Sequence, residues 1–193
     1  MELINMTNRR KVLAVIAAAI MALMAGIVAL LMVSPSAVAE QTGTKFAFAR
    51  IVNAEGDAIG AAMLTQRQEE VRIFAWTRGL TPGKHGIHIH AVGLCDPAAF
   101  TTAGGHFNPE MKQHGLENPA GAHGGDLPNL EVRENGLGIL NADNDRISLL
   151  EGPKSLFDAD GSALIIHASE DDQMTDPTGN SGARIACGVI QAK

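Results

Sequence analysis

Histidine is the residue type best suited to chemistry in this chain, because all seven histidines lie between His85 and His167. The first three belong to the sequence HGIHIH at residues 85–90. In a strand, side chains alternate with a period of two, so His88 and His90 would share one face with Cα atoms about 6.5 to 7 Å apart. That spacing allows two imidazoles to bind one ion, but it also fits two solvated histidines on an exposed face.

A second array of potential ligands follows. His106, His114 and His123 precede Asp126, which comes three residues after His123. Three imidazoles and one carboxylate are a complete tetrahedral set for a structural zinc ion. The segment that holds them, residues 104–129, contains 12 Gly, Pro or Asn in 26 residues. A bound metal would order such a loop, which has no hydrophobic core of its own. The alternative is a set of unrelated polar residues on the surface.

Short strands must position these histidines. Alternating or continuous apolar residues predict strands at residues 46–51, 62–65, 71–76, 85–92, 130–132, 137–141, 147–150 and 163–167. Strands separated by turn signals about every 8 to 12 residues predict an antiparallel sandwich or barrel. His167 would lie at a strand end, where a lone histidine is usually only packed or hydrogen-bonded. A second irregular segment, residues 168–183, follows it.

The N-terminal part predicts export. Residues 12–33 are apolar except for one glycine, which is long enough to span a bilayer, and three basic residues precede them. Ala37 and Ala39 form an A-x-A cleavage site. We therefore expect a signal peptide or membrane anchor at residues 1–39, a folded domain at residues 40–193, and a periplasmic or otherwise extracytoplasmic location.

Net charge and cysteine content bear on the binding partner and on disulfide formation. Residues 40–193 contain 12 Lys and Arg against 20 Asp and Glu, so their formal charge is 12 − 20 = −8. Such an acidic domain argues against a nucleic-acid partner, because phosphate binding needs clustered cations. In an oxidising compartment, Cys95 and Cys187 are expected to form a disulfide. The alternative for both is a small buried hydrophobic residue.

Several separated motifs together resemble the copper/zinc superoxide dismutases, particularly their bacterial periplasmic branch. The motifs are HGIHIH at 85–90, AGGHFNP at 103–109, KQHG at 112–115, AHGGDLPNL at 122–130, IIHASEDD at 165–172 and GNSGARIACGVI at 179–190. The resemblance implies an immunoglobulin-like Greek-key sandwich or barrel with two long functional loops. It covers most of the predicted exported domain.

The resemblance also implies a ligand set for one copper and one zinc ion per subunit. The implied copper ligands are His88, His90, His106 and His167. The implied zinc ligands are His106, His114, His123 and Asp126. His106 would bridge the two ions and act as one proton source, whereas His85 would be structural.

Two further residues gain roles by resemblance. Asp171 would hydrogen-bond one copper ligand, His88, and one zinc ligand, His114, and so fix the orientation of their rings. Arg184 would line the copper channel and attract the anion. The second irregular segment, residues 168–183, contains four acidic residues and no lysine. Attraction of an anion would therefore depend on local charge near the copper.

The implied activity is the conversion of superoxide to dioxygen and hydrogen peroxide by alternate reduction and oxidation of copper. A periplasmic copper- and zinc-binding protein without dismutase activity would use the same ligands. An exported domain in which zinc alone orders the loop would hold zinc and bind no copper at His88 and His90. The sequence is compatible with a monomer or a homodimer. If residues 12–33 are retained, they would attach the protein to the inner membrane.

Overall fold

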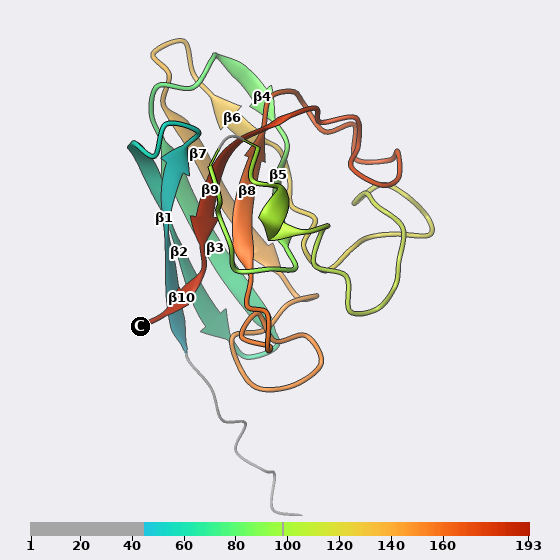
Figure 1. The fold of residues 1–193 in the computed structure, drawn as a ribbon. Helices are drawn as coiled ribbons and strands as arrows, with labels where there is room; N and C mark the ends of the chain where they lie inside the picture. The colour runs from blue at the N-terminus through green and yellow to red at the C-terminus, as the bar shows by residue number, and fades with distance from the viewer. Residues whose placement is uncertain (1–44, 98) are drawn as a thin grey trace, which may run out of the picture. The chain divides into compact units, whose positions relative to one another are not determined.

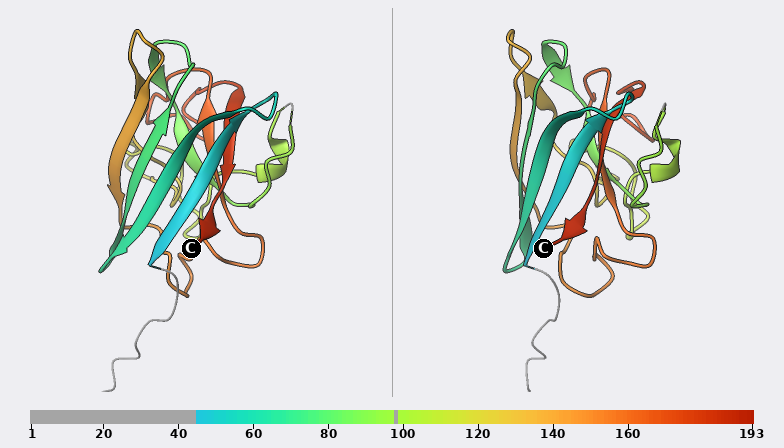
Figure 2. Two further views of the ribbon diagram at one scale, coloured as in Figure 1. Left: turned by 90° about the vertical axis from the view of Figure 1, so that its left-hand side faces the viewer. Right: turned by 60° about the vertical axis from the view of Figure 1, so that its left-hand side comes forward.

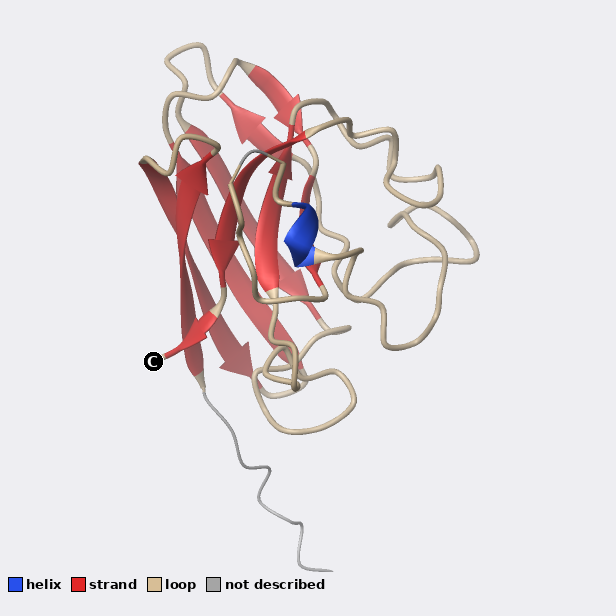
Figure 3. Ribbon diagram, viewed as in Figure 1, coloured by secondary structure: helices blue, strands red, loops and turns tan. Residues whose placement is uncertain are grey.

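The computed structural model describes residues 45–97 and 99–193, and most of their regular structure is β-strand (Figure 1; Figure 3). One short 3-10 helix, η1, spans Thr101–Ala103. The strands are β1 Phe46–Asn53, β2 Ala58–Arg67, β3 Glu70–Thr77, β4 Gly83–His85, β5 Ile87–His90, β6 Leu130–Val132, β7 Gly138–Asn144, β8 Ala163–His167, β9 Arg184–Val189 and β10 Gln191–Ala192.

Antiparallel pairing joins the strands into one path, in the order β4-β6-β7-β3-β2-β1-β9-β8-β5, and β10 also pairs with β1. The two ends of the path, β4 and β5, are separated in sequence only by Gly86, so the sheet bends into a nearly closed barrel (Figure 2). The connections from β3 to β4 and from β7 to β8 cross over other strands, as in a Greek key. The predicted antiparallel Greek-key barrel of the immunoglobulin-like class is confirmed.

The period-2 pattern of the sequence determines which side chains fill the barrel. On β1, Ala47, Ala49 and Ile51 are buried, and the residues between them are exposed. Cross-strand pairing places Ala49 opposite Ala62 and Ala47 opposite Leu64, so buried residues of β1 and β2 face the same core. This core continues to β5, where Ile87 and Ile89 are also fully buried and therefore turn the intervening histidine away from it. The predicted division of the β5 side chains between two faces is confirmed.

One predicted strand is wrong. Residues 147–150 form no strand, and Ser148 forms only an isolated bridge with Ser155. Ile147 and Leu149 are nevertheless buried in the core. The alternation of apolar residues therefore reports burial of an irregular segment and not membership of the sheet.

The predicted strand at residues 85–92 is shorter than expected and is divided. Gly86 separates β4 from β5, and β5 ends at His90. A Cβ atom on Gly86 would lie 2.7 Å from the Cβ atom of Ser181, so the loop at residues 168–183 packs directly against this break.

The predicted export segment, residues 1–39, and the first residues of the predicted domain lie outside the described residues. Among residues 45–97 and 99–193, no helix is long and apolar enough to cross a membrane.

Candidate metal centre

The long loop at residues 104–129 completes the edge of β5. The backbone N–H of Ile89 donates to the carbonyl of Gly125 (2.9 Å), and the N–H of Phe107 donates to the carbonyl of Ile89 (2.8 Å). The N–H of Gly125 in turn donates to the carbonyl of Phe107 (2.8 Å). Glycine is required at position 125, because a Cβ atom there would lie 2.0 Å from the carbonyl oxygen of Ile89.

This backbone pairing brings the two sequence arrays together. Isolated bridges pair His90 with His106 and His88 with Asp126. The next strand along the sheet, β8, ends at His167 and pairs with β5 along its length. Residues from the loop, β5 and β8 therefore meet at one place.

Four histidines form a first cluster, in which the potential ligand atoms all lie within 4.8 Å of one another. Each member has one buried ring nitrogen without a hydrogen-bond partner among the described residues. These nitrogens are His88 Nδ1, His90 Nε2, His106 Nε2 and His167 Nε2. A buried polar group left unpaired costs about 1–3 kcal/mol. Four of them at one point are accounted for by a bound metal ion, and imidazole ligands suit copper.

The other ring nitrogen of each histidine in the first cluster is held by an oxygen atom. These contacts are His88 Nε2 to Asp171 Oδ2 (2.7 Å), His90 Nδ1 to the Gly104 carbonyl (2.9 Å), His106 Nδ1 to Asp126 Oδ1 (2.9 Å) and His167 Nδ1 to the Gly182 carbonyl (3.0 Å). Such contacts fix the ring orientation and leave the unpaired nitrogen free to bind a metal.

Burial keeps the first cluster neutral. Loss of solvation lowers the pKa of His88 to about 3, that of His90 to about 2 and that of His167 to about 4. Hydrogen bonds to Asp171 and to backbone carbonyls oppose this change only in part. Burial also lowers the pKa of His106. These imidazoles are therefore in the unprotonated form that metal binding requires.

A second cluster surrounds the carboxylate of Asp126. Its Oδ1 atom lies 2.9 Å from His106 Nδ1, 3.0 Å from His114 Nδ1 and 3.3 Å from His123 Nδ1. The Oδ2 atom accepts hydrogen bonds from the backbone N–H groups of Gly115 and His123, each at 2.9 Å. Although burial by itself would raise the pKa of Asp126, these contacts lower it far below its usual range.

The second cluster has the donor set of a structural zinc site. Its four potential ligand atoms lie within 4.8 Å of one another, and His106 Nδ1 lies only 3.3 Å from His123 Nδ1. Three imidazoles and one carboxylate around one point match the tetrahedral coordination of zinc. His106 belongs to both clusters through its two different nitrogens.

Asp171 connects the two clusters. Its Oδ1 atom accepts from His114 Nε2 (3.0 Å) and its Oδ2 atom from His88 Nε2 (2.7 Å), and all three side chains are fully buried. Burial alone would lower the pKa of His114, but hydrogen bonds to Asp126 and Asp171 raise it to about 9. Gly179 makes room for this contact, because a Cβ atom there would lie 1.7 Å from Asp171 Oδ1.

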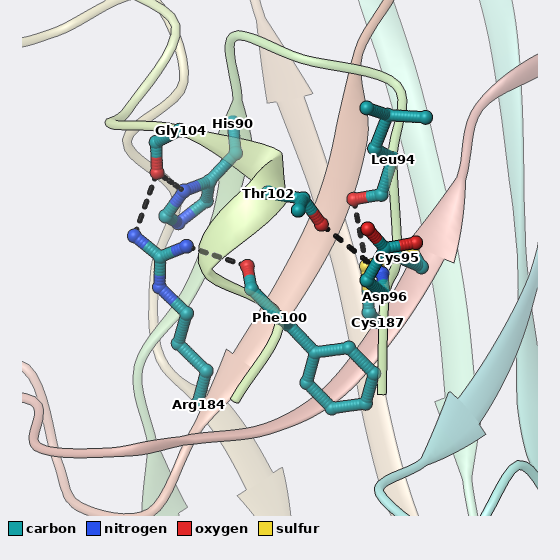
Figure 4. The surroundings of a disulfide bond; sticks show 9 residues. All are labelled: His90, Leu94, Cys95, Asp96, Phe100, Thr102, Gly104, Arg184 and Cys187. Carbon is teal, nitrogen blue, oxygen red and sulfur yellow. Dashed lines mark hydrogen bonds between the residues drawn. A yellow bond between two sulfur atoms is a disulfide. The ribbon is translucent and has the colours of Figure 1, made fainter. Parts of the chain in front are cut away.

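Arg184 points toward His90 of the first cluster and the Gly104 carbonyl (Figure 4). Its two terminal nitrogens donate to the carbonyls of Phe100 (2.7 Å) and Gly104 (2.6 Å). The Gly104 carbonyl also accepts from His90 Nδ1, so one oxygen atom orients both the arginine and a histidine of the first cluster. Loss of solvation lowers the pKa of Arg184. A guanidinium nevertheless stays charged at physiological pH.

The predicted disulfide is confirmed. Cys95 and Cys187 are bonded, with Cα atoms 5.7 Å apart. Cys187 lies on β9, three residues after Arg184, whereas Cys95 lies in the loop that leads to η1. The disulfide therefore ties that loop, which ends at the Phe100 carbonyl bound by Arg184, to β9.

The seventh histidine has a structural position. His85 is buried, and its ring nitrogens contact the carbonyls of His167 (2.7 Å) and Thr81 (2.9 Å). It thereby connects β4 to the end of β8 without joining either cluster.

Two residues that support the second cluster are absent from the sequence predictions. Arg146 donates to the carbonyls of His123 (3.1 Å) and Asp126 (2.9 Å) and so holds the backbone between them. Asp176 Oδ1 accepts from the N–H of His114 (2.6 Å) and lies 3.7 Å from His123 Nε2. Neither residue belongs to a spaced array of ligands, so no local signal in the sequence identifies them.

Comparison with known proteins agrees with the two metal-ligand clusters that the geometry shows. The family model for copper/zinc superoxide dismutase (SODC) matches residues 58–190. Copper/zinc superoxide dismutase 2 of Aquifex aeolicus (strain VF5) is 45% identical over 147 residues, which are 75% of this chain and 86% of the relative. The superoxide dismutase-like protein YojM of Bacillus subtilis (strain 168) is 46% identical over 146 residues, covering 73% of this chain and 74% of that protein.

A solved structure shares the fold. The crystal structure of a double mutant of a SOD-like protein from Bacillus subtilis has a TM-score of 0.71 and 45% sequence identity, and the match covers 73% of this chain and 94% of the other. The barrel, the matched family model and these relatives agree over most of the chain, and the chain therefore belongs to the copper/zinc superoxide dismutase family.

Proposed function

We propose that this chain is an oxidoreductase that converts superoxide to dioxygen and hydrogen peroxide, with one copper and one zinc ion per subunit. The first cluster, His88, His90, His106 and His167, would hold copper. The second cluster, His106, His114, His123 and Asp126, would hold zinc. The observation that carries this proposal is the set of four buried, unpaired ring nitrogens, one of which belongs to a histidine shared with the second cluster.

The overall reaction consumes two superoxide anions and two protons and yields one dioxygen and one hydrogen peroxide. When bound, copper supplies the reversible one-electron chemistry, whereas zinc has no accessible second oxidation state. The chain itself must attract an anion and supply protons. Arg184 provides a fixed positive charge beside His90, in a domain that is otherwise acidic. His106 can hold a proton at Nε2, because its Nδ1 is retained by the second cluster.

A metal-binding protein without dismutase activity remains the second candidate. The Bacillus subtilis relative is named only as superoxide dismutase-like, so similarity to it does not by itself imply the activity. In this chain, both complete clusters and Arg184 favour the enzyme, because storage of a metal requires neither a shared histidine nor a cation held beside the ligands.

The sequence supports a proposal for the location and attachment of the protein. We propose that the domain works outside the cytoplasm, which agrees with a disulfide between its only two cysteines. Residues 12–33 would export the chain and, if they are retained, anchor it to the inner membrane. The folded part would act as a monomer or a homodimer. Sequencing the N-terminus of the mature protein tests cleavage, because a start at Glu40 means a freely diffusing enzyme.

The activity is tested by measuring metal content and superoxide consumption on the same purified chain. We expect one copper and one zinc per subunit, rapid loss of superoxide and production of peroxide. The variant His90→Ala removes one ligand of the first cluster only, so it should lose copper and activity while it retains zinc. Full metal loading without consumption of superoxide would instead establish the metal-binding protein.

A further inference from the structure

Large apolar side chains gather on the outer face of β1, β2 and β3. In the left view of Figure 2 these strands lie in front of the two long loops. Cross-strand pairing makes the group continuous, because Phe48 lies opposite Met63 and Met63 lies opposite Phe74. The group, which we call the aromatic face, comprises Phe46, Phe48, Met63, Phe74 and Trp76, with exposed fractions of 53, 43, 54, 39 and 39%.

These side chains do not serve the barrel core, which is filled from the opposite side of the same strands. They also lie away from the metal clusters along the sheet, because β9 and β8 separate β1 from β5. A continuous exposed apolar surface of this kind on a folded domain marks a place of interaction.

Cations border the aromatic face. Arg50 follows Phe46 and Phe48 on the outward side of β1, and Lys193 lines the same groove as Phe46 and Trp76. At the opposite border, Asp143 is paired with Arg72. A cationic edge beside aromatic rings is unusual for a domain whose formal charge is 12 − 20 = −8. This combination suits the interfacial region of a bilayer with anionic headgroups, which accepts aromatic rings and attracts Lys and Arg.

The position of the apolar N-terminal residues supports the same partner. Residues 34–45 separate the apolar residues 12–33 from Phe46, and they number 45 − 33 = 12. Twelve extended residues reach at most about 40 Å. If residues 12–33 are inserted in a bilayer, β1 is therefore held close to its surface.

We infer that the aromatic face rests on the surface of an anionic phospholipid bilayer, which leaves the edge with the two metal clusters facing the aqueous side. A second copy of the chain is a poorer occupant, because pairing two such faces would bring two sets of cations together. This inference concerns where the protein acts and is independent of its dismutase activity.

Trp76 provides a direct probe, because it is the only tryptophan in the 193 residues and the chain has no tyrosine. The full chain is reconstituted in vesicles of phosphatidylcholine and phosphatidylglycerol whose acyl chains carry bromine, a contact quencher of tryptophan. We expect loss of about half or more of the Trp76 emission, as for an aromatic ring at the interface. In matched vesicles without bromine, the emission should shift to shorter wavelength and resist aqueous acrylamide.

Variants identify the surface responsible. Phe48→Ser and Phe74→Ser, tested separately, should each restore part of the Trp76 emission, whereas Met111→Ser, at a side chain that is 90% exposed in a loop, should not. Arg50→Glu should reduce quenching only when phosphatidylglycerol is present. Retention of the disulfide and of bound metal verifies that each variant is folded.

Three results would overturn the inference. Emission that is unaffected by bromine and fully quenched by acrylamide would show that the face is exposed to water. Protection from acrylamide without bromine quenching would show a protein occupant. If that protection disappears in nanodiscs that hold one copy, the occupant is a second copy; if it persists, residues 1–44 cover the face. None of these outcomes depends on superoxide consumption, so failure of the inference is separable from failure of the proposed activity.

Discussion

Asp171→Asn should weaken metal binding at both clusters, although Asp171 belongs to neither set of proposed ligands. Its two carboxylate oxygens accept from His88 Nε2 (2.7 Å) and His114 Nε2 (3.0 Å). Asparagine keeps one oxygen and replaces the other by an NH₂ group, so one of the two ring N–H groups faces a donor.

The size of the effect follows from burial. All three side chains are completely buried, so water cannot replace the lost acceptor. A lost hydrogen bond to a charged group is worth about 1.5–3 kcal/mol, and loss of such a supporting contact typically lowers metal affinity about 10- to 100-fold. We expect a decrease in this range at the cluster whose histidine loses its acceptor, and a smaller decrease at the other.

The assay is competition with chelators of known affinity, carried out separately for copper and zinc. Asp172→Asn is the matched control, because the neighbouring carboxylate accepts from the backbone N–H groups of Met174 and Thr175 and contacts no histidine. A second readout is the number of protons released on zinc binding at neutral pH. Asp171 helps to raise the pKa of His114 to about 9, so the variant should release fewer. Unchanged affinity for both metals in Asp171→Asn would refute the reasoning.

Four other outcomes are expected. Arg184→Ala should lower the rate of superoxide consumption and weaken its salt dependence; a native rate at low salt would contradict the steering role. Zinc affinity should rise about tenfold per pH unit up to about pH 9, because below that pH zinc must displace a proton from His114. In the zinc-free protein, copper affinity should change little between about pH 5 and about pH 8, because the pKa of His90 is about 2 and its ring is already unprotonated there. Chelator competition across pH measures the pH dependence of both metal affinities. Replacing Cys95 and Cys187 by serine should lower the free energy of unfolding by about 4 to 5 kcal/mol for the separation of 92 residues, measured by urea denaturation.

The positions of the ligands on β5 could be predicted from their spacing in the sequence, because strand geometry is regular. A period of two is enough to place His88 and His90 on the side of β5 opposite Ile87 and Ile89, and the structure shows this division. The same rule failed at residues 147–150, where apolar residues enter the core from an irregular segment. Periodicity reports which side chains are buried, but it does not report whether a backbone finds a partner strand.

The contacts that support the clusters were less predictable. Arg146 and Asp176 act on the backbone and rings of the second cluster from segments far along the chain. Their positions depend on how the loops close on the barrel, and neither carries a local pattern. The same is true of Gly125, whose requirement follows only from the close approach of the Ile89 carbonyl.

The sequence alone therefore determined the barrel class and the candidate ligand residues. The barrel class follows from local alternation, and the candidate ligands follow from the separated motifs. Only the tertiary structure decided that the ring nitrogens left unpaired are those of the first cluster, and that His106 turns a different nitrogen toward each cluster. It also revealed the aromatic face, because outward side chains on three strands become one surface only when the strands pair. Both results require distances between residues remote in sequence, and chain folding alone sets those distances.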